Sequence, residues 1–272
     1  AIPLDLLFSC WFFFLFWKAE QVVGSMAGIN QPGYPFVAQQ ILGGYLGIAI
    51  VALWLARKPI WQLIKEAVRA GSDVDDSGEP MEYRTAVLGI ILGISFLVFF
   101  SYQAGMTIRF ALAFFGVYFA IAFAHTRARA ELGPPMHGIH YFGPFQFFMA
   151  AAGSRKLANQ TLTAAAPFWT FTKQFRNHPM PYILESFKLA DRSGMDTRKL
   201  GRVIMLSVVV SLILTFWTFL QFSYKWGGIS EGRGIEAYAT IERWLVRPVE
   251  PDMQSLGAIA VGALFVFTNT TL

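Results

Sequence analysis

Six apolar stretches, each close to the length that crosses a lipid bilayer, constrain this chain more than any other feature. They cover residues 2–17, 37–56, 85–102, 106–124, 203–224 and 256–268. A bilayer core about 30 Å thick requires about 20 predominantly apolar residues per helix. Helix is the expected conformation, because backbone polar groups find no water in hydrocarbon. The sequence therefore predicts an all-α, polytopic transmembrane bundle with five or six spans, forming a single domain over residues 1–272.

The composition agrees with a membrane protein and excludes other classes. Hydrophobic residues make up 55% of the chain and charged residues only 14%, whereas a soluble domain carries about 25% charged residues. A disordered chain is excluded because it requires low hydrophobicity and high charge. A disulfide scaffold is excluded because the chain has a single cysteine, Cys10. The lipid bilayer is therefore the first expected partner.

The basic residues are concentrated in two loops. Most of the 22 Lys and Arg residues fall within residues 57–84 and 125–202, and helices that alternate in direction place both loops on the same side of the membrane. Cytoplasmic loops carry an excess of Lys and Arg, so we expect both to be cytoplasmic and residues 225–255 to form an extracytoplasmic loop. The net charge of +5 is therefore explained by basic residues on the cytoplasmic face. It does not indicate nucleic-acid binding, and no nucleic-acid partner is predicted.

The long loop at residues 125–202 is too apolar for an ordinary cytoplasmic loop. It contains all four histidines, and glycines and prolines interrupt helix formation around residues 129–148 and 163–181. Broken apolar backbone is tolerated in a membrane only where protein buries it or where it lines a water-filled cavity. We therefore expect a re-entrant or pocket-lining segment. Amphipathic patterns at residues 60–70 and 182–192 predict surface helices.

Small residues recur four positions apart within several spans, a spacing that lets helix backbones approach closely. The pairs are Gly43 with Gly47, Gly89 with Gly93, and Ala258 with Gly262. A moving helix interface, as in a transporter, is one interpretation. Static packing is the more common reason for this spacing.

Residues of the broken region are the candidates for a substrate path. They are Arg127, Arg129, Glu131, Pro134, Pro135, His137, His140 and His178. Arg127, Arg129 and Glu131 are expected to control its cytoplasmic mouth. Asp5 is the one carboxylate within a predicted span, and ionisable groups inside a membrane are costly and usually functional. It is a candidate ion relay, although its position near the start of the span also fits an interfacial location.

A metal site and an enzyme are weaker interpretations of the same region. His137 and His140 lie three residues apart with Glu131 nearby, which could begin a metal site. The spacing is loose, and no metalloprotease, hydrolase or nucleotide-binding motif occurs in the sequence. The other interpretation is that these histidines hydrogen-bond backbone groups freed by the glycines and prolines. We therefore predict no metal site and no enzyme, and assign no cofactor or catalytic residue.

Four motifs together resemble one known family. They are I-P-L-D-L-L-F-S from Ile2, D-D-S-G-E-P-M from Asp75, R-A-E-L-G-P-P from Arg129, and H-P-M-P with E-S-F-K-L-A from His178. The chain is similar to an uncharacterised family of large bacterial and archaeal multi-spanning membrane proteins, a domain of unknown function. The resemblance implies a prokaryotic cytoplasmic membrane, a loose kinship with the oligopeptide transporter superfamily, and a longer protein of which this chain is a fragment. It implies no substrate and no site residue.

These observations favour part of a secondary-transporter-like permease for a small organic solute or a peptide, driven by an ion gradient. The alternatives are a structural or accessory subunit of a larger membrane complex and an intramembrane metalloenzyme that uses Glu131, His137 and His140. Besides lipid, the expected partners are missing parts of the same chain, other membrane subunits, or a second copy in a homo-oligomer.

Overall fold

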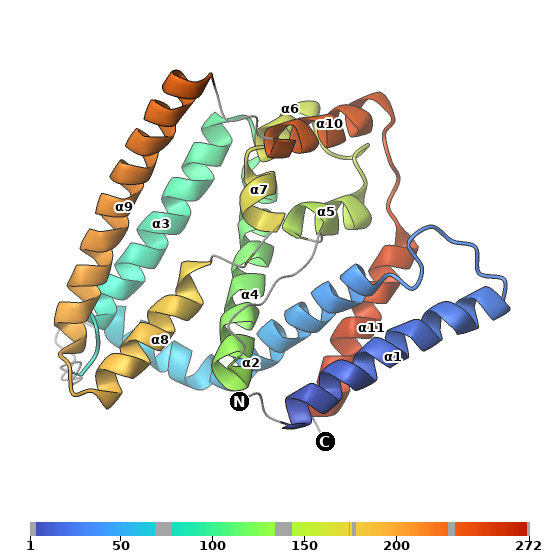
Figure 1. The fold of residues 1–272 in the computed structure, drawn as a ribbon. Coiled ribbons are helices and arrows are strands. Elements are labelled where there is room, and N and C mark those ends of the chain that lie inside the picture. The colour runs from blue at the N-terminus through green and yellow to red at the C-terminus, as the bar shows by residue number, and fades with distance from the viewer. Residues whose placement is uncertain are drawn as a thin grey trace.

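The computed structural model of the protein describes residues 4–68, 78–133, 143–173, 175, 178–227 and 232–270. Eleven α-helices occupy these residues (Figure 1). No β-strand occurs among them. The predicted all-α class is therefore confirmed.

Six of the described helices are long and apolar enough to cross a membrane. They are α1 (Leu4–Met26), α2 (Val37–Val68), α3 (Tyr83–Gln103), α4 (Ile108–Leu132), α9 (Thr197–Trp226) and α11 (Met253–Thr270). Each overlaps one of the apolar stretches, so the prediction of a polytopic transmembrane bundle is confirmed. The helices are longer than most of the stretches, because hydropathy marks only the part that hydrocarbon surrounds.

The second span differs from its prediction. The Arg57-Lys58-Pro59 sequence indicates an end there, followed by a separate surface helix over residues 60–70, but α2 continues through Pro59 to Val68. That prediction is wrong because a proline removes only one helical hydrogen bond, a loss that membrane helices tolerate where nearby polar groups compensate.

Helices α2 and α11 pack closely through glycine. A Cβ added at Gly43 would overlap the carbonyl oxygen of Ile259, and one added at Gly47 would lie 3.1 Å from the carbonyl oxygen of Ala263. Gly262 of α11 is equally close to the backbone of α2. The predicted small-residue interface is confirmed for these three glycines, and it brings the two backbones into contact.

Three spans present most of their apolar side chains outward. In their most apolar windows, no residue is buried in α1 or α9, and 6% are buried in α3. A Cβ added at Gly89 or Gly93 of α3 would meet nothing within 4 Å among the described residues, so no close helix contact is seen there. These surfaces are suited to contact with lipid or with further membrane helices.

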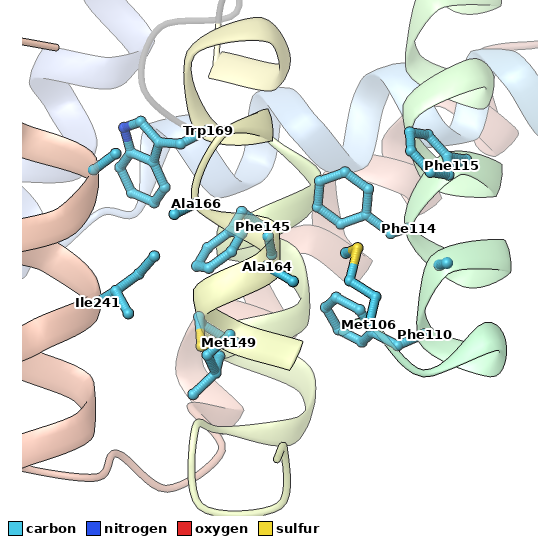
Figure 2. Close-up of a cluster of buried hydrophobic side chains, with 14 residues drawn as sticks. Met106, Phe110, Phe114, Phe115, Phe145, Met149, Ala164, Ala166, Trp169 and Ile241 are labelled. Carbon is cyan, nitrogen blue, oxygen red and sulfur yellow. The ribbon is translucent and has the colours of Figure 1, made fainter. Parts of the chain in front are cut away.

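Four shorter helices surround the first half of α4. They are α5 (Pro144–Ala152), α6 (Asn159–Ala165), α7 (Phe168–Lys173) and α10 (Gly232–Val246). Their buried side chains and those of α4 form one apolar cluster (Figure 2). The ring of Phe145 in α5 lies 5.3 Å from those of both Trp169 and Trp244, which are 6.2 Å from each other. This cluster holds the short helices against the span.

The segment between α4 and α8 (Pro179–Arg192) runs back along α4. Helix α4 has 25 residues and is about 37 Å long, and it ends at Leu132. Helix α6 nevertheless contacts its opposite end, where the Thr107 N–H donates to Thr161 Oγ1 at 3.4 Å. Arg155 pairs with Glu250, just before α11, and α6 lies beside α10 at this end of α4 (Figure 1). Helix α8 then lies at the C-terminal end of α4, so the chain runs the length of α4 and returns. We call it the re-entrant segment, and its position relative to a membrane stays a prediction.

Candidate functional site

A group of aromatic and imidazole rings lies where the re-entrant segment returns along α4. Tyr118 and His125 come from α4, Tyr45 from α2, and Phe175 and His178 from the chain before α8. We call these five residues the histidine cluster. It gathers two imidazoles and two phenols from three separate parts of the chain.

Phe175 lies at the centre of the histidine cluster. Its ring centroid is 5.3 Å from that of Tyr118, 5.9 Å from that of His178 and 6.1 Å from that of His125. Tyr45 extends the group from the other side, 6.3 Å from His125. Both His125 and Phe175 are only 1% exposed. His125 and Phe175 are therefore closed to solvent, while Tyr45, Tyr118 and His178 are half-buried.

Helical spacing explains why one face of α4 carries these groups. Tyr118 and His125 are seven residues apart, and Arg129 follows four residues later, so all three share one face of the helix. At 1.5 Å per residue, Tyr118 lies about 21 Å and His125 about 10 Å from the C-terminal end of α4. Tyr118 lies inside the apolar stretch at residues 106–124, and His125 follows directly after its end, so we expect Tyr118 within the hydrocarbon core and His125 at its edge. Ionisable groups at such depths commonly mark substrate or ion pathways.

Arg129 lies at the end of this face and joins α4 to α8. Its Nε donates to Oε1 of Glu185 at 2.6 Å, and its Nη2 donates to Oε2 at 3.0 Å. The guanidinium also lies 4.1 Å from the ring centroid of Tyr182, a cation–π distance. The side chain of Arg129 is 8% exposed and that of Glu185 is 52% exposed. This is a bidentate ion pair, buried on one side and open on the other.

Arg127 and Glu131 form a separate pair on the surface of α4. Their 2.9 Å contact joins residues four positions apart, and both side chains are well exposed. Arg127 and Arg129 point away from each other because two helical residues are about 200° apart. Of the three residues expected at the mouth of the path, only Arg129 contacts α8 through an ion pair among the described residues.

His178 begins α8 and connects it to the histidine cluster. Its Nδ1 accepts a hydrogen bond from the Met180 N–H at 3.3 Å, which caps the helix, and Pro179 occupies a favoured first position. Its ring lies 5.9 Å from that of Tyr118.

Two cavities flank the contact between α4 and α8. One, of about 340 Å³, borders Arg129, Glu185, Lys188 and Arg192. The other, of about 440 Å³, is bordered mainly by apolar side chains, including Phe123, Met180, Ile183 and Phe187. The end of the re-entrant segment therefore has space on both sides of its anchor.

The other expected site residues fall elsewhere. Pro134, Pro135, His137 and His140 lie outside the described residues. Asp5 is exposed in the first turn of α1, where its carboxylate accepts from the Leu6 N–H at 3.0 Å. Within the described ranges no group of three His, Cys, Asp or Glu side chains could hold a metal ion, and the alternative site at Glu131, His137 and His140 stays a prediction.

Sequence reasoning missed several residues of this site. Glu185 follows Arg129 by 56 positions, and no local pattern distinguishes it from other acidic residues of the surface. Tyr45 and Tyr118 look like ordinary span aromatics. His125 directly follows the apolar stretch that ends at residue 124, so hydropathy assigned it to the loop, whereas α4 continues to Leu132 and buries it.

The comparisons with known proteins give a family and no function. Residues 2–272 match the family described as "Family of unknown function (DUF6785)". No match was found among curated proteins or among solved structures. The resemblance to an uncharacterised family is therefore confirmed, while kinship with the oligopeptide transporter superfamily has no support from these comparisons. The chain is a helical membrane protein that belongs to the family of unknown function DUF6785.

Proposed function

We propose that this chain is part of a secondary-transporter-like permease for a small organic solute or a peptide. The histidine cluster lines the path, and the pair of Arg129 with Glu185 closes one end of it. The observation that carries the proposal is the re-entrant segment, which brings His178 and Phe175 against Tyr118 and His125 of a membrane-spanning helix. Transporters build their sites from broken helices inside the membrane.

The Arg129–Glu185 pair has the properties of a releasable closure. Glu185 is half-exposed, so water can solvate its carboxylate when α8 moves away. Arg129 stays on α4, and movement of α8 would uncover its guanidinium as well, because the Tyr182 ring that covers it belongs to α8. Movement of α8 would also displace His178, which caps that helix. One motion thus opens the end of the path and rearranges the cluster behind it.

The closed end faces the cytoplasm in this proposal. Helix α8, the C-terminal end of α4 and the start of α9 lie at one end of the bundle (Figure 1), and they carry most of the basic residues of the 125–202 region. The positive-inside rule assigns such an end to the cytoplasm. A gradient of ions across the membrane would drive the solute.

A structural or accessory subunit is the second candidate function. The outward apolar surfaces of α1 and α9, which bury no residue of their most apolar windows, favour it because subunit contacts would cover them. Purification in mild detergent separates the two functions. A stable stoichiometric complex with other membrane proteins supports the subunit, and a lone monomer or homodimer supports the permease.

Access of water to the histidine cluster tests the path itself. In a Cys10→Ser background, Tyr118→Cys is expected to react with a small, charged, water-soluble thiol reagent in proteoliposomes. The matched control is Phe119→Cys, one residue along the same helix and 42% exposed on its surface. A thiol in lipid stays protonated and unreactive, so we expect reaction at position 118 to be at least about 10-fold faster.

The two variants share one depth in the membrane, so the comparison isolates the path. If neither cysteine reacts, or if both react at the same rate, water does not enter selectively along this face of α4 and the proposed path is wrong.

A further inference from the structure

The 340 Å³ cavity between α4 and α8 has an excess of positive charge. The ion pair of Arg129 with Glu185 is enough to close the path, so the additional basic residues need another explanation. Three basic side chains line it, Arg129, Lys188 and Arg192, against one carboxylate, Glu185. Glu185, Lys188 and Arg192 belong to α8 and are spaced three and four residues apart, which places them on one face of that helix. With the single negative charge tied to Arg129, the rim of the cavity attracts anions.

The basic side chains are able to bind a further group. Glu185 engages two of the five N–H donors of Arg129. Lys188 contacts Asp191 at 3.3 Å, but both side chains are more than 60% exposed, and such surface pairs contribute little. Arg192 lies exposed at the last turn of α8. Arginine and lysine in this arrangement suit the oxygens of a phosphate group.

The cavity lies at the depth of lipid headgroups. Arg129 is three residues before the end of α4, about 5 Å from its C-terminus along the helix axis. The neighbouring cavity, on the other side of the α4–α8 contact, is apolar. Leu189, on α8 between the two basic residues, is 67% exposed. An amphiphile in the bilayer can therefore reach this cavity directly.

We propose that this cavity binds the phosphate of an anionic phospholipid headgroup, with Lys188 and Arg192 as its contacts and Arg129 as its inner wall. Basic pockets between membrane helices on the cytoplasmic side are suited to such headgroups, and the volume is in the range of ligand sites. The bound phosphate bridges α8 to the surrounding lipid. Binding does not depend on whether the protein transports a solute.

Titration of the purified protein in mild detergent, followed by native mass spectrometry, tests this site. We expect phosphatidylglycerol to bind more tightly than phosphatidylcholine. In Lys188→Ala/Arg192→Ala its affinity should fall by about 30-fold, because each basic residue contributes about fivefold near a membrane surface. The control, Lys156→Ala/Lys225→Ala, removes the same charge just before α6 and at the end of α9, which lie at the other end of the bundle (Figure 1), and should bind as the unmodified protein does.

Thermal unfolding separates a lipid from a soluble ligand. Phosphatidylglycerol should raise the Tm of the unmodified protein and of the control, whereas millimolar inorganic phosphate should raise neither. Equal phosphatidylglycerol affinity in both double variants overturns the proposal. So does a rise in Tm with inorganic phosphate that the Lys188→Ala/Arg192→Ala variant abolishes, because the site would then belong to a soluble anion. The circular dichroism spectra of both variants confirm that they fold.

Discussion

Replacing Gly43 with alanine is expected to lower the free energy of unfolding by about 3 kcal/mol. The added methyl group would overlap the carbonyl oxygen of Ile259 in α11, and a backbone atom cannot rotate away as a side chain does. The two helices must therefore separate, which loosens the contacts on both sides of Gly43, including the close approach at Gly262. Unfolding in mild detergent, followed by circular dichroism, measures the loss.

Gly44→Ala is the matched control for this effect. Its Cβ would meet only the Val266 side chain, at 3.9 Å, which is ordinary van der Waals contact. Alanine is the better helix former by about 1 kcal/mol, so this variant should be as stable as the unmodified protein or slightly more so. Equal losses at positions 43 and 44 would contradict the glycine-mediated packing of α2 on α11.

Glu185→Ala is expected to destabilise the protein by about 2–3 kcal/mol, and Arg129→Met by about 1 kcal/mol. The asymmetry follows from burial. Removal of Glu185 leaves a guanidinium that is 8% exposed without its bidentate acceptor, whereas removal of Arg129 leaves a carboxylate that is 52% exposed and that water can solvate. Denaturant unfolding of both variants in the same detergent measures the difference.

Glu131→Gln provides the control for this pair. Its contact with Arg127 lies on the surface of α4, so its loss should cost no more than about 0.5 kcal/mol. The double variant Arg129→Met/Glu185→Leu should recover most of the stability lost in Glu185→Ala, because no charge is then left buried. If Arg129→Met proves more damaging than Glu185→Ala, the buried guanidinium is not the source of the cost.

The spans could be predicted from the sequence because hydrocarbon imposes one rule on every membrane helix. The apolar stretch at residues 85–102 lies within α3, and the stretch at 203–224 lies within α9. The continuation of α2 through Pro59 could not be predicted in this way. Whether a proline ends a helix depends on how its surroundings accommodate one missing helical hydrogen bond, and the local sequence does not specify those surroundings.

The sequence predicted that the segment after α4 is buried, but it did not predict which residues the segment contacts. Broken apolar chain required a buried location, and the structure supplies one in the cluster around Phe145 and Phe114 (Figure 2). The partner of Arg129 was not predictable, since Arg127 and Arg129 are alike in sequence and Glu131 is nearer to both. Only the tertiary placement of α8 turns Arg129 toward Glu185 and leaves Arg127 on the surface.

The most direct test of the permease is uptake by the protein, expressed from its complete reading frame and reconstituted in proteoliposomes with a proton gradient. We expect at least one member of a panel of short peptides and small organic solutes to accumulate above the level in empty liposomes. His125→Phe preserves a ring in the histidine cluster and removes its ionisable group, and uptake should fall by at least about 10-fold. Uptake equal to empty liposomes for every solute, with folded protein, would contradict the account.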